Sequence, residues 1–420
     1  MPPEARLRGH ATRPGLAGLG APRPTRTAQR LGAVDAGGPL LARSAPRPAA
    51  SAGARPGGRS PRLVPERALR VCDVALFYAP RSGGIRTYLD AKAAHVEATG
   101  AYEHHVIVPG PVEHHEAGRH TLPSVALTAS NGYRLPLGVS RLEQTLARIR
   151  PDVVLLHDPF WGPVNVTRTA HRLGAKVVAV HHGSSELDAA GLPGPDGLYV
   201  GVLRAWLRRA YRSADAVMSV VDPFPDCGRP ADLPLRLGVH EAFRPQSGVA
   251  RGDHVLYVGR LAREKGVLEL LEAAARSREP WELRLVGSGP LEDQLRARAA
   301  RYGIAHRVTF APFVADREEL ARLYAGARCV VMPGVHETFG LVGLEAAASG
   351  ARVVACATAP SARECGALAH RFEPGDLRGL VEAIADARWA RQDLMSAAAL
   401  AWRMRWAQLF AAEQRGLVAL

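Results

Sequence analysis

The chain has 420 residues, of which 47% are hydrophobic and 6% aromatic, a globular composition in a chain too long for one ordinary core. Its formal net charge of +14 would suggest a nucleic-acid partner if the charge were evenly spread. However, residues 1–69 hold twelve arginines against three acidic residues, so most of the excess lies there. The rest of the chain therefore gives no reason to expect a specific nucleic-acid partner.

Residues 1–69 are rich in Ala, Arg, Pro and Gly and have no hydrophobic periodicity, which predicts a disordered basic extension. Three interpretations remain open: an Arg-rich targeting peptide, an electrostatic tether to an anionic membrane or nucleic acid, or translated sequence upstream of the true start. The segment lacks the compact apolar stretch of a secretory signal and shows no amphipathic helix. We favour a dispensable extension and leave open whether it belongs to the mature protein.

The chain contains no stretch of about eighteen apolar residues, so no membrane-spanning helix is predicted. Its cysteines form no Cys-x-x-Cys pair, a distribution that suits a reducing compartment. They are Cys72, Cys227, Cys329, Cys356 and Cys365. We therefore expect a cytoplasmic protein and leave open a peripheral contact with the inner face of a membrane.

The first predicted strand covers residues 70–77 and is followed by a turn that contains Gly83 and Gly84, then by a helix over 85–97. Glycines at a strand-to-helix turn let the backbone approach a ligand closely. A Gly-Gly turn alone is also found in NAD enzymes, kinases and ordinary turns. A Rossmann oxidoreductase would need Gly-x-Gly-x-x-Gly with an acidic residue about twenty positions on, which this turn does not supply.

Two further predicted strands, 152–157 and 176–181, end in polar residues, where open α/β sheets bind ligands. His157 ends the first of them, as a polar strand cap or a ligand contact, and His181 and His182 end the second. Adjacent histidines point apart in an extended chain and no third ligand is spaced to join them, so we expect no metal site. The pairs at 104–105 and 114–115 are interpreted as surface loop residues.

A predicted helix over 202–212 carries a row of arginines that could contact anionic lipid or simply face solvent. They are Arg204, Arg208, Arg209 and Arg212. Beyond it, residues 244–252 have the composition of a linker. This divides the folded chain into an N-terminal domain of residues 70–243, a C-terminal domain of 253–390 and C-terminal helices over 391–420.

The second half alternates predicted strands with helices, which specifies a parallel sheet covered on both faces. The strands expected are 255–258, 283–286, 307–310, 329–332 and 351–355. Both halves thus predict an α/β fold with two Rossmann-like domains.

Two cations follow the strand over 255–258, namely Arg260 and Lys265 in a turn punctuated by glycine. The chain has only three lysines among its 54 basic residues, so a lysine here suggests that a compact point charge suits the site. Gly287 follows the next strand. Charge-assisted bonds from such cations to phosphate contribute roughly 1.5–3 kcal/mol each.

The segment 334–350 places two carboxylates, Glu337 and Glu345, eight positions apart around the start of a predicted helix. Phe339, Gly340 and Leu341 would present free N–H groups at the positive end of the helix dipole, an arrangement suited to phosphate. A capped surface helix with a solvated Glu337 is the structural alternative.

This segment resembles the Glu-x7-Glu signature of the retaining family 4 (group 1) glycosyltransferases, and its flanks Phe339-Gly340-Leu341 and Glu345-Ala346 strengthen the match. The resemblance covers about residues 70–415 and implies the GT-B fold, two Rossmann-like domains facing across a cleft. It implies an acceptor-side N-terminal domain, a nucleotide-sugar-binding C-terminal domain, and C-terminal helices that cross back. The loops 308–313 and 359–364 lack glycines that the family often has, which bears on base preference or acceptor entry.

The resemblance also implies roles for individual residues. Arg260 and Lys265 would neutralise the donor diphosphate, Glu337 would hold the donor sugar and Glu345 the ribose hydroxyls. The remaining implied contacts are the Gly83-Gly84 turn beside the donor phosphate, Gly287 beside the nucleotide, and His181 beside the donor sugar, with His182 kept as an alternative.

We therefore expect a retaining, metal-independent hexosyltransferase without a cofactor, whose donor is a GDP- or UDP-linked sugar. GDP-mannose is favoured by analogy alone. The expected acceptor is a lipid, a glycan or a small molecule. A nucleotide-sugar epimerase of the same fold and a non-catalytic nucleotide-sugar-binding protein are the alternatives, and analysis of the products would separate them.

Overall fold

The computed structural model describes residues 68–76, 78, 84–126, 134–157, 159–183, 185, 196–335 and 337–420. Gly83 and residues 1–67 of the predicted extension lie outside the described residues. All described residues belong to one compact unit, Pro65–Leu420, which contains two separate sheets.

The first sheet is built mainly from parallel strands in the order β3-β4-β2-β1-β6-β7-β8-β9, with β5 paired to β4. Only β3 and β5, at one side, run antiparallel to β4. The strands are β1 (Arg70–Val74), β2 (Glu103–Gly110), β3 (His114–Glu116), β4 (Arg119–Ala126), β5 (Arg134–Pro136), β6 (Val153–Leu156), β7 (Lys176–His181), β8 (Ala216–Ser219) and β9 (Leu233–Pro234).

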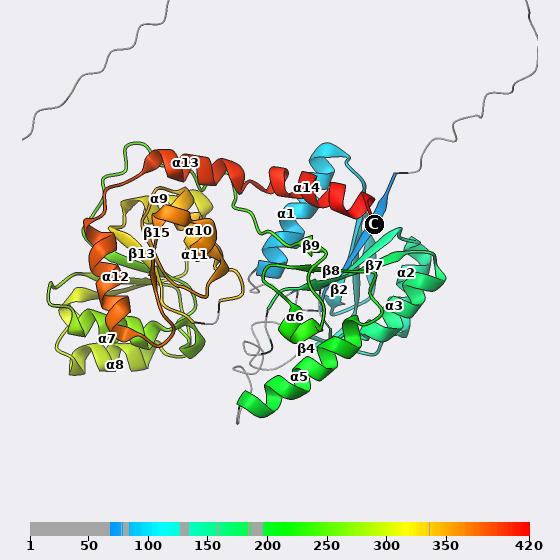
Figure 1. The fold of residues 1–420 in the computed structure, drawn as a ribbon, viewed down its shortest axis with the longest axis horizontal. Coiled ribbons are helices and arrows are strands. Elements are labelled where there is room, and N and C mark those ends of the chain that lie inside the picture. Colours follow the sequence, from blue (N-terminus) through cyan, green and yellow to red (C-terminus); the bar gives the residue numbers. More distant parts are fainter. Residues whose placement is uncertain are drawn as a thin grey trace, which may run out of the picture. The chain divides into compact units, whose positions relative to one another are not determined.

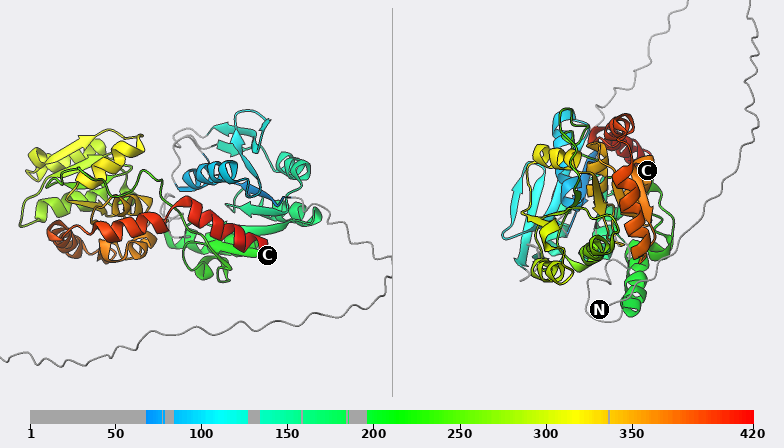
Figure 2. Two further views of the ribbon diagram at one scale, coloured as in Figure 1. Left: turned by 90° about the horizontal axis from the view of Figure 1, so that it is seen from above. Right: turned by 90° about the vertical axis from the view of Figure 1, so that its left-hand side faces the viewer.

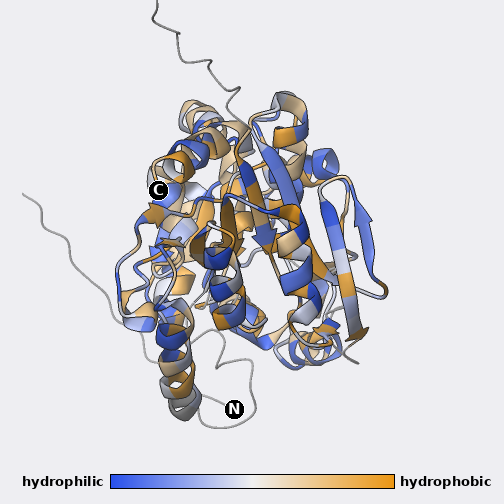
Figure 3. Cartoon of the chain, turned by 90° about the vertical axis from the view of Figure 1, so that its right-hand side faces the viewer, coloured by the Kyte–Doolittle hydropathy of each residue, from blue (hydrophilic) through white to orange (hydrophobic). Residues whose placement is uncertain are grey.

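The central strands of this sheet are continuous hydrophobic runs because helices cover both faces, as parallel sheets require. Every residue of β6 and β8 is buried. The described helices of this domain are α1 (Gly84–Thr99), α2 (Ser140–Ile149), α3 (Pro163–Arg172), α5 (Asp196–Tyr211) and α6 (Phe224–Cys227). Figure 3 shows hydrophobic residues along the inner strands of the chain.

The second sheet is parallel throughout, in the order β12-β11-β10-β13-β14-β15. Its strands are β10 (Val255–Val258), β11 (Leu283–Val286), β12 (Val308–Ala311), β13 (Cys329–Met332), β14 (Val353–Cys356) and β15 (Ala369–Phe372). The α-helices are α7 (Val267–Arg276), α8 (Glu292–Arg301), α9 (Arg317–Gly326), α10 (Leu341–Ala348), α11 (Pro360–Glu364) and α12 (Leu377–Trp389). The described part of the second domain also contains three 3-10 helices, η1 (Arg263–Lys265), η2 (Ala305–Arg307) and η3 (Gly366–Leu368). The predicted class, two α/β domains with parallel sheets, is confirmed.

Several local predictions were wrong. His104 and His105 lie in β2 and His114 and His115 in β3, rather than in loops. The His104 side chain is not on the surface, because it is only 5% exposed and its Nε2 lies 2.7 Å from Asp73 Oδ2. These strands were missed because polar residues interrupt the hydrophobic pattern near the edge of the sheet.

The end of the chain, where the sequence predicts C-terminal helices over residues 391–420, forms two helices, α13 (Leu394–Arg403) and α14 (Trp406–Val418). The break falls at Arg405, whose extended backbone forms a β-bridge with Val239. Helix α13 contacts α10 of the second domain, whereas α14 contacts α1 of the first. Figure 1 shows α14 beside α1, and the left view of Figure 2 follows the two C-terminal helices in red.

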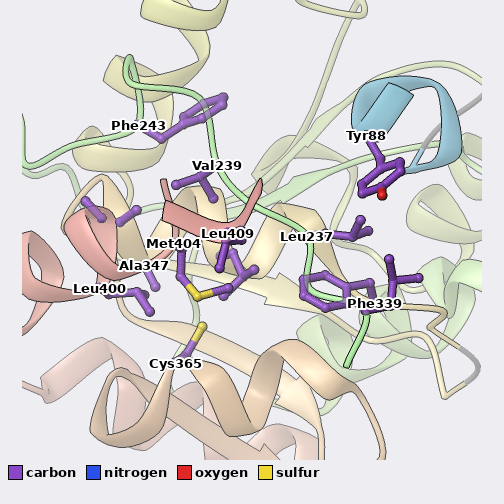
Figure 4. Close-up of a cluster of buried hydrophobic side chains, with 14 of the residues drawn as sticks. Tyr88, Leu237, Val239, Phe243, Phe339, Ala347, Cys365, Leu400, Met404 and Leu409 are labelled. Atoms are coloured by element: carbon purple, nitrogen blue, oxygen red, sulfur yellow. The ribbon is translucent and has the colours of Figure 1, made fainter. Parts of the chain in front are cut away.

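A buried hydrophobic cluster includes residues from both connections between the domains (Figure 4). Leu237 and Val239 belong to the connection after β9, and Leu400 and Met404 to the C-terminal one. None of the described helices is both long enough and apolar enough to cross a membrane.

Candidate active site

The clearest grouping of predicted site residues joins the turn after β10 to the loop before α10. Lys265 is the last residue of η1, and its Nζ donates a hydrogen bond to Glu337 Oε1 at 2.6 Å. The Glu337 side chain is 15% exposed and the Lys265 side chain 33% exposed. A cation and a carboxylate separated by 72 residues in sequence are thus held in contact, with both still reachable from solvent.

Arg260 lies in the same turn but has a different partner. Its guanidinium pairs with Glu264, one turn along the chain, and its side chain is 47% exposed. The carbonyl of Arg260 accepts a hydrogen bond from the Tyr257 hydroxyl at 2.7 Å, which fixes the backbone and leaves the side chain at the surface. The structure therefore brings Lys265, and not the Arg260 guanidinium, to Glu337.

Helix α10 begins directly after Gly340, whose φ of 82° is a left-handed conformation that favours glycine. A Cβ at this position would lie 2.2 Å from Ser361 Oγ, so the close approach of α11 also requires glycine. The carbonyl of Phe339 accepts a hydrogen bond from Ser361 N at 2.9 Å. Phe339 is buried and Leu341, the first helical residue, is partly exposed. The first-turn N–H groups of α10, which have no acceptor within their own helix, therefore begin a few residues after Glu337 in the chain.

Gly287, directly after β11, allows two loops to touch. Its φ is 135°, and a Cβ would lie 2.1 Å from the carbonyl oxygen of Gly259. Leu261 N donates to Ser288 O at 3.0 Å beside this contact. The turn after β10 and the turn after β11 therefore form one continuous surface at the carboxyl ends of neighbouring strands.

Gly287→Ala is expected to destabilise the protein by about 1–3 kcal/mol, the usual cost of a strained backbone conformation held against a steric contact. The obstacle is a backbone oxygen, which no side-chain rotation can remove. Gly303→Ala is the matched control, because Gly303 also has a positive φ, 71°, but no atom within 4 Å of the added Cβ. In urea unfolding, Gly287→Ala should lose more free energy of unfolding than Gly303→Ala. Equal losses would contradict the close contact between Gly287 and the Gly259 carbonyl as the cause.

Glu345 lies in the middle of α10, and its Oε2 accepts a hydrogen bond from the Tyr324 hydroxyl at 3.1 Å. Burial raises the pKa of the Glu345 carboxyl to about 7, and the Tyr324 hydrogen bond only partly opposes that shift. Near neutral pH this carboxyl is therefore poised to lose a proton when a ligand offers hydrogen-bond donors. Tyr324, in α9, was not singled out from the sequence.

In the first domain, Gly84 is the first residue of α1, and among the described residues a Cβ there would meet Leu237 alone, at 3.5 Å. His181 ends β7 and is 5% exposed. Its Nε2 lies 3.4 Å from Asp226 Oδ2, and its ring packs edge-on against Tyr211. His181 is thus oriented by buried groups, whereas its neighbour His182 is more exposed and contacts His157.

Sequence analysis missed a buried polar network that joins β1, α1 and α14. Lys92 Nζ lies 3.0 Å from Asp73 Oδ2 and 2.9 Å from Glu413 Oε1, and both Lys92 and Asp73 have fully buried side chains. The Tyr88 hydroxyl donates to Glu413 Oε2 at 2.6 Å. The only available indications were a lysine in a chain with three of them and an acidic residue inside a hydrophobic strand.

Comparison with known proteins agrees with this geometry. Residues 82–222 match the family model described as Glycosyltransferase Family 4, and residues 252–387 match the model described as Glycosyl transferases group 1. The GDP-mannose-dependent alpha-(1-6)-phosphatidylinositol dimannoside mannosyltransferase of Mycobacterium tuberculosis is 33% identical over 313 residues, covering 69% of this chain and 80% of that protein. The D-inositol 3-phosphate glycosyltransferase of Acidothermus cellulolyticus is 31% identical over 294 residues, covering 60% and 64%.

Solved structures share the fold at lower identity. Sucrose-phosphate synthase from Thermosynechococcus elongatus superposes with a TM-score of 0.66 at 19% identity, covering 84% of this chain and 99% of that one. Anabaena HepE in complex with UDP gives a TM-score of 0.63 at 18% identity, covering 84% and 100%. These likenesses establish the GT-B arrangement of two parallel-sheet α/β domains.

Proposed function

Since the chain belongs to the family 4 (group 1) glycosyltransferases, we propose that it transfers a hexose from a nucleotide diphosphate sugar to a hydroxyl group of an acceptor. The observation that carries this proposal is the contact between Lys265 Nζ and Glu337 Oε1 beside the start of α10. It places a cation for phosphate, a carboxylate for sugar hydroxyls and the free amides of a helix start in one small region.

The proposed reaction retains configuration at the anomeric carbon. The acceptor oxygen attacks that carbon on the face from which the diphosphate departs, the bond between carbon and phosphate oxygen breaks, and the departing phosphate takes the acceptor proton. Charge accumulates on the diphosphate, so stabilising it lowers the barrier. We assign this stabilisation to Lys265, the exposed Arg260 and the amides at Gly340 and Leu341, without a metal ion. Glu337 would orient the donor sugar.

Glu345 is proposed to accept hydrogen bonds from the ribose hydroxyls. Such bonds favour the ionised carboxylate, so the pKa of Glu345 should fall from about 7 when the nucleotide binds. Near pH 7 binding should therefore release protons, and affinity should increase with pH until it levels off above about 7. Below that point the gain is limited to about tenfold per pH unit for a single titrating group.

Calorimetric titration of GDP and UDP at pH 7, in buffers with different ionisation enthalpies, measures that proton release. Glu345→Gln is the control, because it keeps the shape of the side chain and removes its titration, while proton changes of the nucleotide remain. The number of protons released should be smaller with the variant. The same number with both proteins would exclude Glu345 as the ribose acceptor.

For the donor we propose GDP-mannose, supported by the printed name of the Mycobacterium tuberculosis relative. The Anabaena structure contains UDP, so UDP-linked sugars are the competing choice. The shift of the thermal unfolding temperature with GDP or UDP at about 1 mM discriminates between the two donor bases. A ligand at about 100 times its Kd stabilises the native state by about 2.7 kcal/mol, which raises that temperature. A shift with UDP and none with GDP would overturn the proposed donor.

The acceptor is proposed to be a hydroxyl-bearing lipid, glycan or small molecule. The names of the two relatives both contain an inositol phosphate group, which makes inositol phosphates and phosphoinositides the first acceptors to test. Product analysis also separates transfer from its alternatives. An epimerase would return a changed nucleotide sugar, and a binding protein would return the donor intact.

A cytoplasmic location with peripheral membrane contact is proposed from helix α5 and its surroundings. Val202 and Phe224 are 63% and 56% exposed. Arg208 and Arg209 are exposed on the same helix as Val202, and Arg212 is exposed directly after the end of that helix. Apolar side chains beside cations suit an anionic lipid surface. The proposal predicts that Arg209→Glu weakens sedimentation with phosphatidylglycerol vesicles and that neither protein sediments with phosphatidylcholine. Equal sedimentation of both proteins with both lipids would identify the arginines as a solvated face.

A further inference from the structure

Three histidines on neighbouring strands of the first sheet lie in a continuous row of polar contacts. His105 Nδ1, in β2, is 3.0 Å from His120 Nε2 in β4, and His120 Nδ1 is 3.0 Å from His115 Nδ1 in β3. A carboxylate closes each end of the row. His105 Nε2 lies 2.9 Å from Glu103 Oε1, and His115 Nε2 lies 3.1 Å from Glu113 Oε1. These five side chains are called the histidine row below.

The histidine row has one more hydrogen bond than three neutral imidazoles can supply. Each of its four contacts needs one proton between the two atoms. A neutral imidazole carries one N–H and an ionised carboxylate carries none, so three neutral histidines provide three protons. With three protons, one of the nitrogen–nitrogen contacts would bring two lone pairs together at 3.0 Å. This count does not depend on which nitrogen carries which proton.

The surroundings of the row keep both carboxylates ionised. Although burial opposes the shift, hydrogen bonds from its histidine partner and from Arg70 lower the pKa of Glu103. Hydrogen bonds from its histidine partner and from Arg141 lower the pKa of Glu113. In β1, Cys72 pairs in register with β2 beside the row, and burial raises the pKa of its thiol well above the usual value, so the thiol is neutral. The row therefore has an anion at each end.

The additional proton belongs to an end of the row and not to its centre. Burial, the two neighbouring histidines and Arg148 lower the pKa of His120 to about 4. His120 therefore donates its single N–H to one neighbour and accepts from the other, which then carries protons on both nitrogens. Either His105 or His115 can be that cation, because each contacts a carboxylate. Both side chains are reachable from solvent, at 14% and 24% exposed.

A proton fits this arrangement better than a metal ion. Among the described residues, no three His, Cys, Asp or Glu side chains are placed to hold one ion together. The two nitrogen–nitrogen contacts use different nitrogens of His120, Nε2 and Nδ1, so the three rings do not converge on one point. A shared proton, in contrast, needs only two facing nitrogens.

We infer that the histidine row binds one proton beyond those of three neutral imidazoles, and that this proton holds the edge strand β3 to β4 and β2. Strand β3 has three residues, lies at one end of the strand order and pairs with β4. When the proton leaves at higher pH, one contact loses its hydrogen bond and one ring has to turn away. The row is therefore a pH-sensitive clamp on this side of the sheet, and it does not depend on the proposed glycosyl transfer.

Nitrogen-15 NMR of the full chain labelled at histidine counts these protons, because neutral and cationic imidazoles have different ring-nitrogen shifts. The resonances of His105, His115 and His120 are assigned by their loss in single variants with phenylalanine at each position. The spectra are recorded at pH 7.5 with EDTA, so that no metal ion competes. Three independent histidines with an ordinary pKa of about 6.5 would together carry a charge of about 0.3 at this pH. The row should carry a charge of about one.

Removing either end of the row separates a shared proton from independent ones. Two imidazoles and one carboxylate have two contacts, which two neutral imidazoles satisfy. His105→Phe and His115→Phe should therefore each leave the remaining two histidines neutral at pH 7.5. If the histidines titrated independently, a cation at one end would persist when the other end is removed.

His114→Gln is the matched control for these variants. His114 lies in the same short strand, and its Nε2 is 2.9 Å from Glu116 Oε1, outside the row. Its replacement removes a histidine and its carboxylate contact from β3 without touching the row. The charge on the row should therefore stay at about one.

The pH dependence of stability gives a second readout. Above pH 7 the unfolded chain has largely neutral histidines while the native row keeps its proton, so the native state binds more protons and stability falls as the pH rises. Urea unfolding measures this effect. The unfolding equilibrium constant should increase by up to about tenfold per pH unit more in the unaltered protein than in His105→Phe or His115→Phe.

A charge near 0.3 on the row of the unaltered protein would overturn the inference. So would a cation that persists in both end variants, or a pH dependence of stability that neither variant changes. Because the two end variants lie on different strands, either one is sufficient if the other does not fold.

Discussion

Lys265→Met is expected to reduce kcat/KM about 100-fold to 1,000-fold, the effect typical of removing one group that stabilises developing charge in an active site. Methionine keeps an unbranched side chain that is one atom shorter than lysine and removes the ammonium group that lies 2.6 Å from Glu337 Oε1. Glu337→Gln should cause a loss of similar size, because an amide cannot pair with the ammonium and offers weaker acceptors to sugar hydroxyls. Steady-state nucleotide release measures both effects.

Arg263→Met is the control for Lys265→Met. Arg263 is an exposed cation two residues away in the same 3-10 helix. The substitution Arg263→Met therefore removes the same charge from the same local structure. Its kcat/KM should remain close to that of the unaltered protein. If both variants lose activity equally, the effect would be a general one of charge, and Lys265 would have no specific role.

Lys92→Met is expected to lower the free energy of unfolding by about 3–5 kcal/mol, the usual cost of breaking a buried ion pair and leaving a charge without its partner. Lys92 lies between two carboxylates, Asp73 and Glu413, and its side chain is fully buried. Removing it leaves two negative groups near each other in the interior. Urea unfolding monitored by circular dichroism gives the loss directly.

Arg378→Met is the comparison for that experiment. Arg378 pairs with Glu382 on the surface of α12, and both side chains are mostly exposed, so its loss should cost no more than about 1 kcal/mol. Adding Glu413→Gln to Lys92→Met should restore part of the lost stability, because one of the two unpaired carboxylates is removed. A Lys92→Met protein as stable as Arg378→Met would show that the buried network does not hold α14 to α1.

The second domain could be predicted well because its signals are local. Each βα unit is a short hydrophobic run followed by a turn and a helix, and the predicted strands 255–258, 283–286 and 329–332 agree with β10, β11 and β13. The candidate residues Glu337, Gly340 and Glu345 lie in one continuous segment, so their spacing could be interpreted directly. Glu337 meets Lys265 because β10 and β13 are adjacent parallel strands whose carboxyl ends share one edge of the sheet.

The first domain was harder to predict because its important contacts are distant in sequence. The Tyr88 hydroxyl and Glu413 are separated by 325 residues, and no local pattern relates them. The strands β2 to β4, on one side of the first sheet, contain histidine, glutamate and arginine, so their pattern resembled a loop. Likewise, sequence alone could not show that Asp226 would face His181 and that His157 would contact His182.

Release of nucleotide from a panel of GDP- and UDP-linked sugars tests the central claim most directly. The full chain would be assayed beside Glu337→Gln and Lys265→Met, with inositol phosphates, phosphoinositides and mixed glycans as acceptors. The account predicts release of GDP from GDP-mannose together with a glycosylated product, and loss of both in the two variants. Absence of release from every donor in the presence of these acceptors, or equal release by the variants, would contradict it.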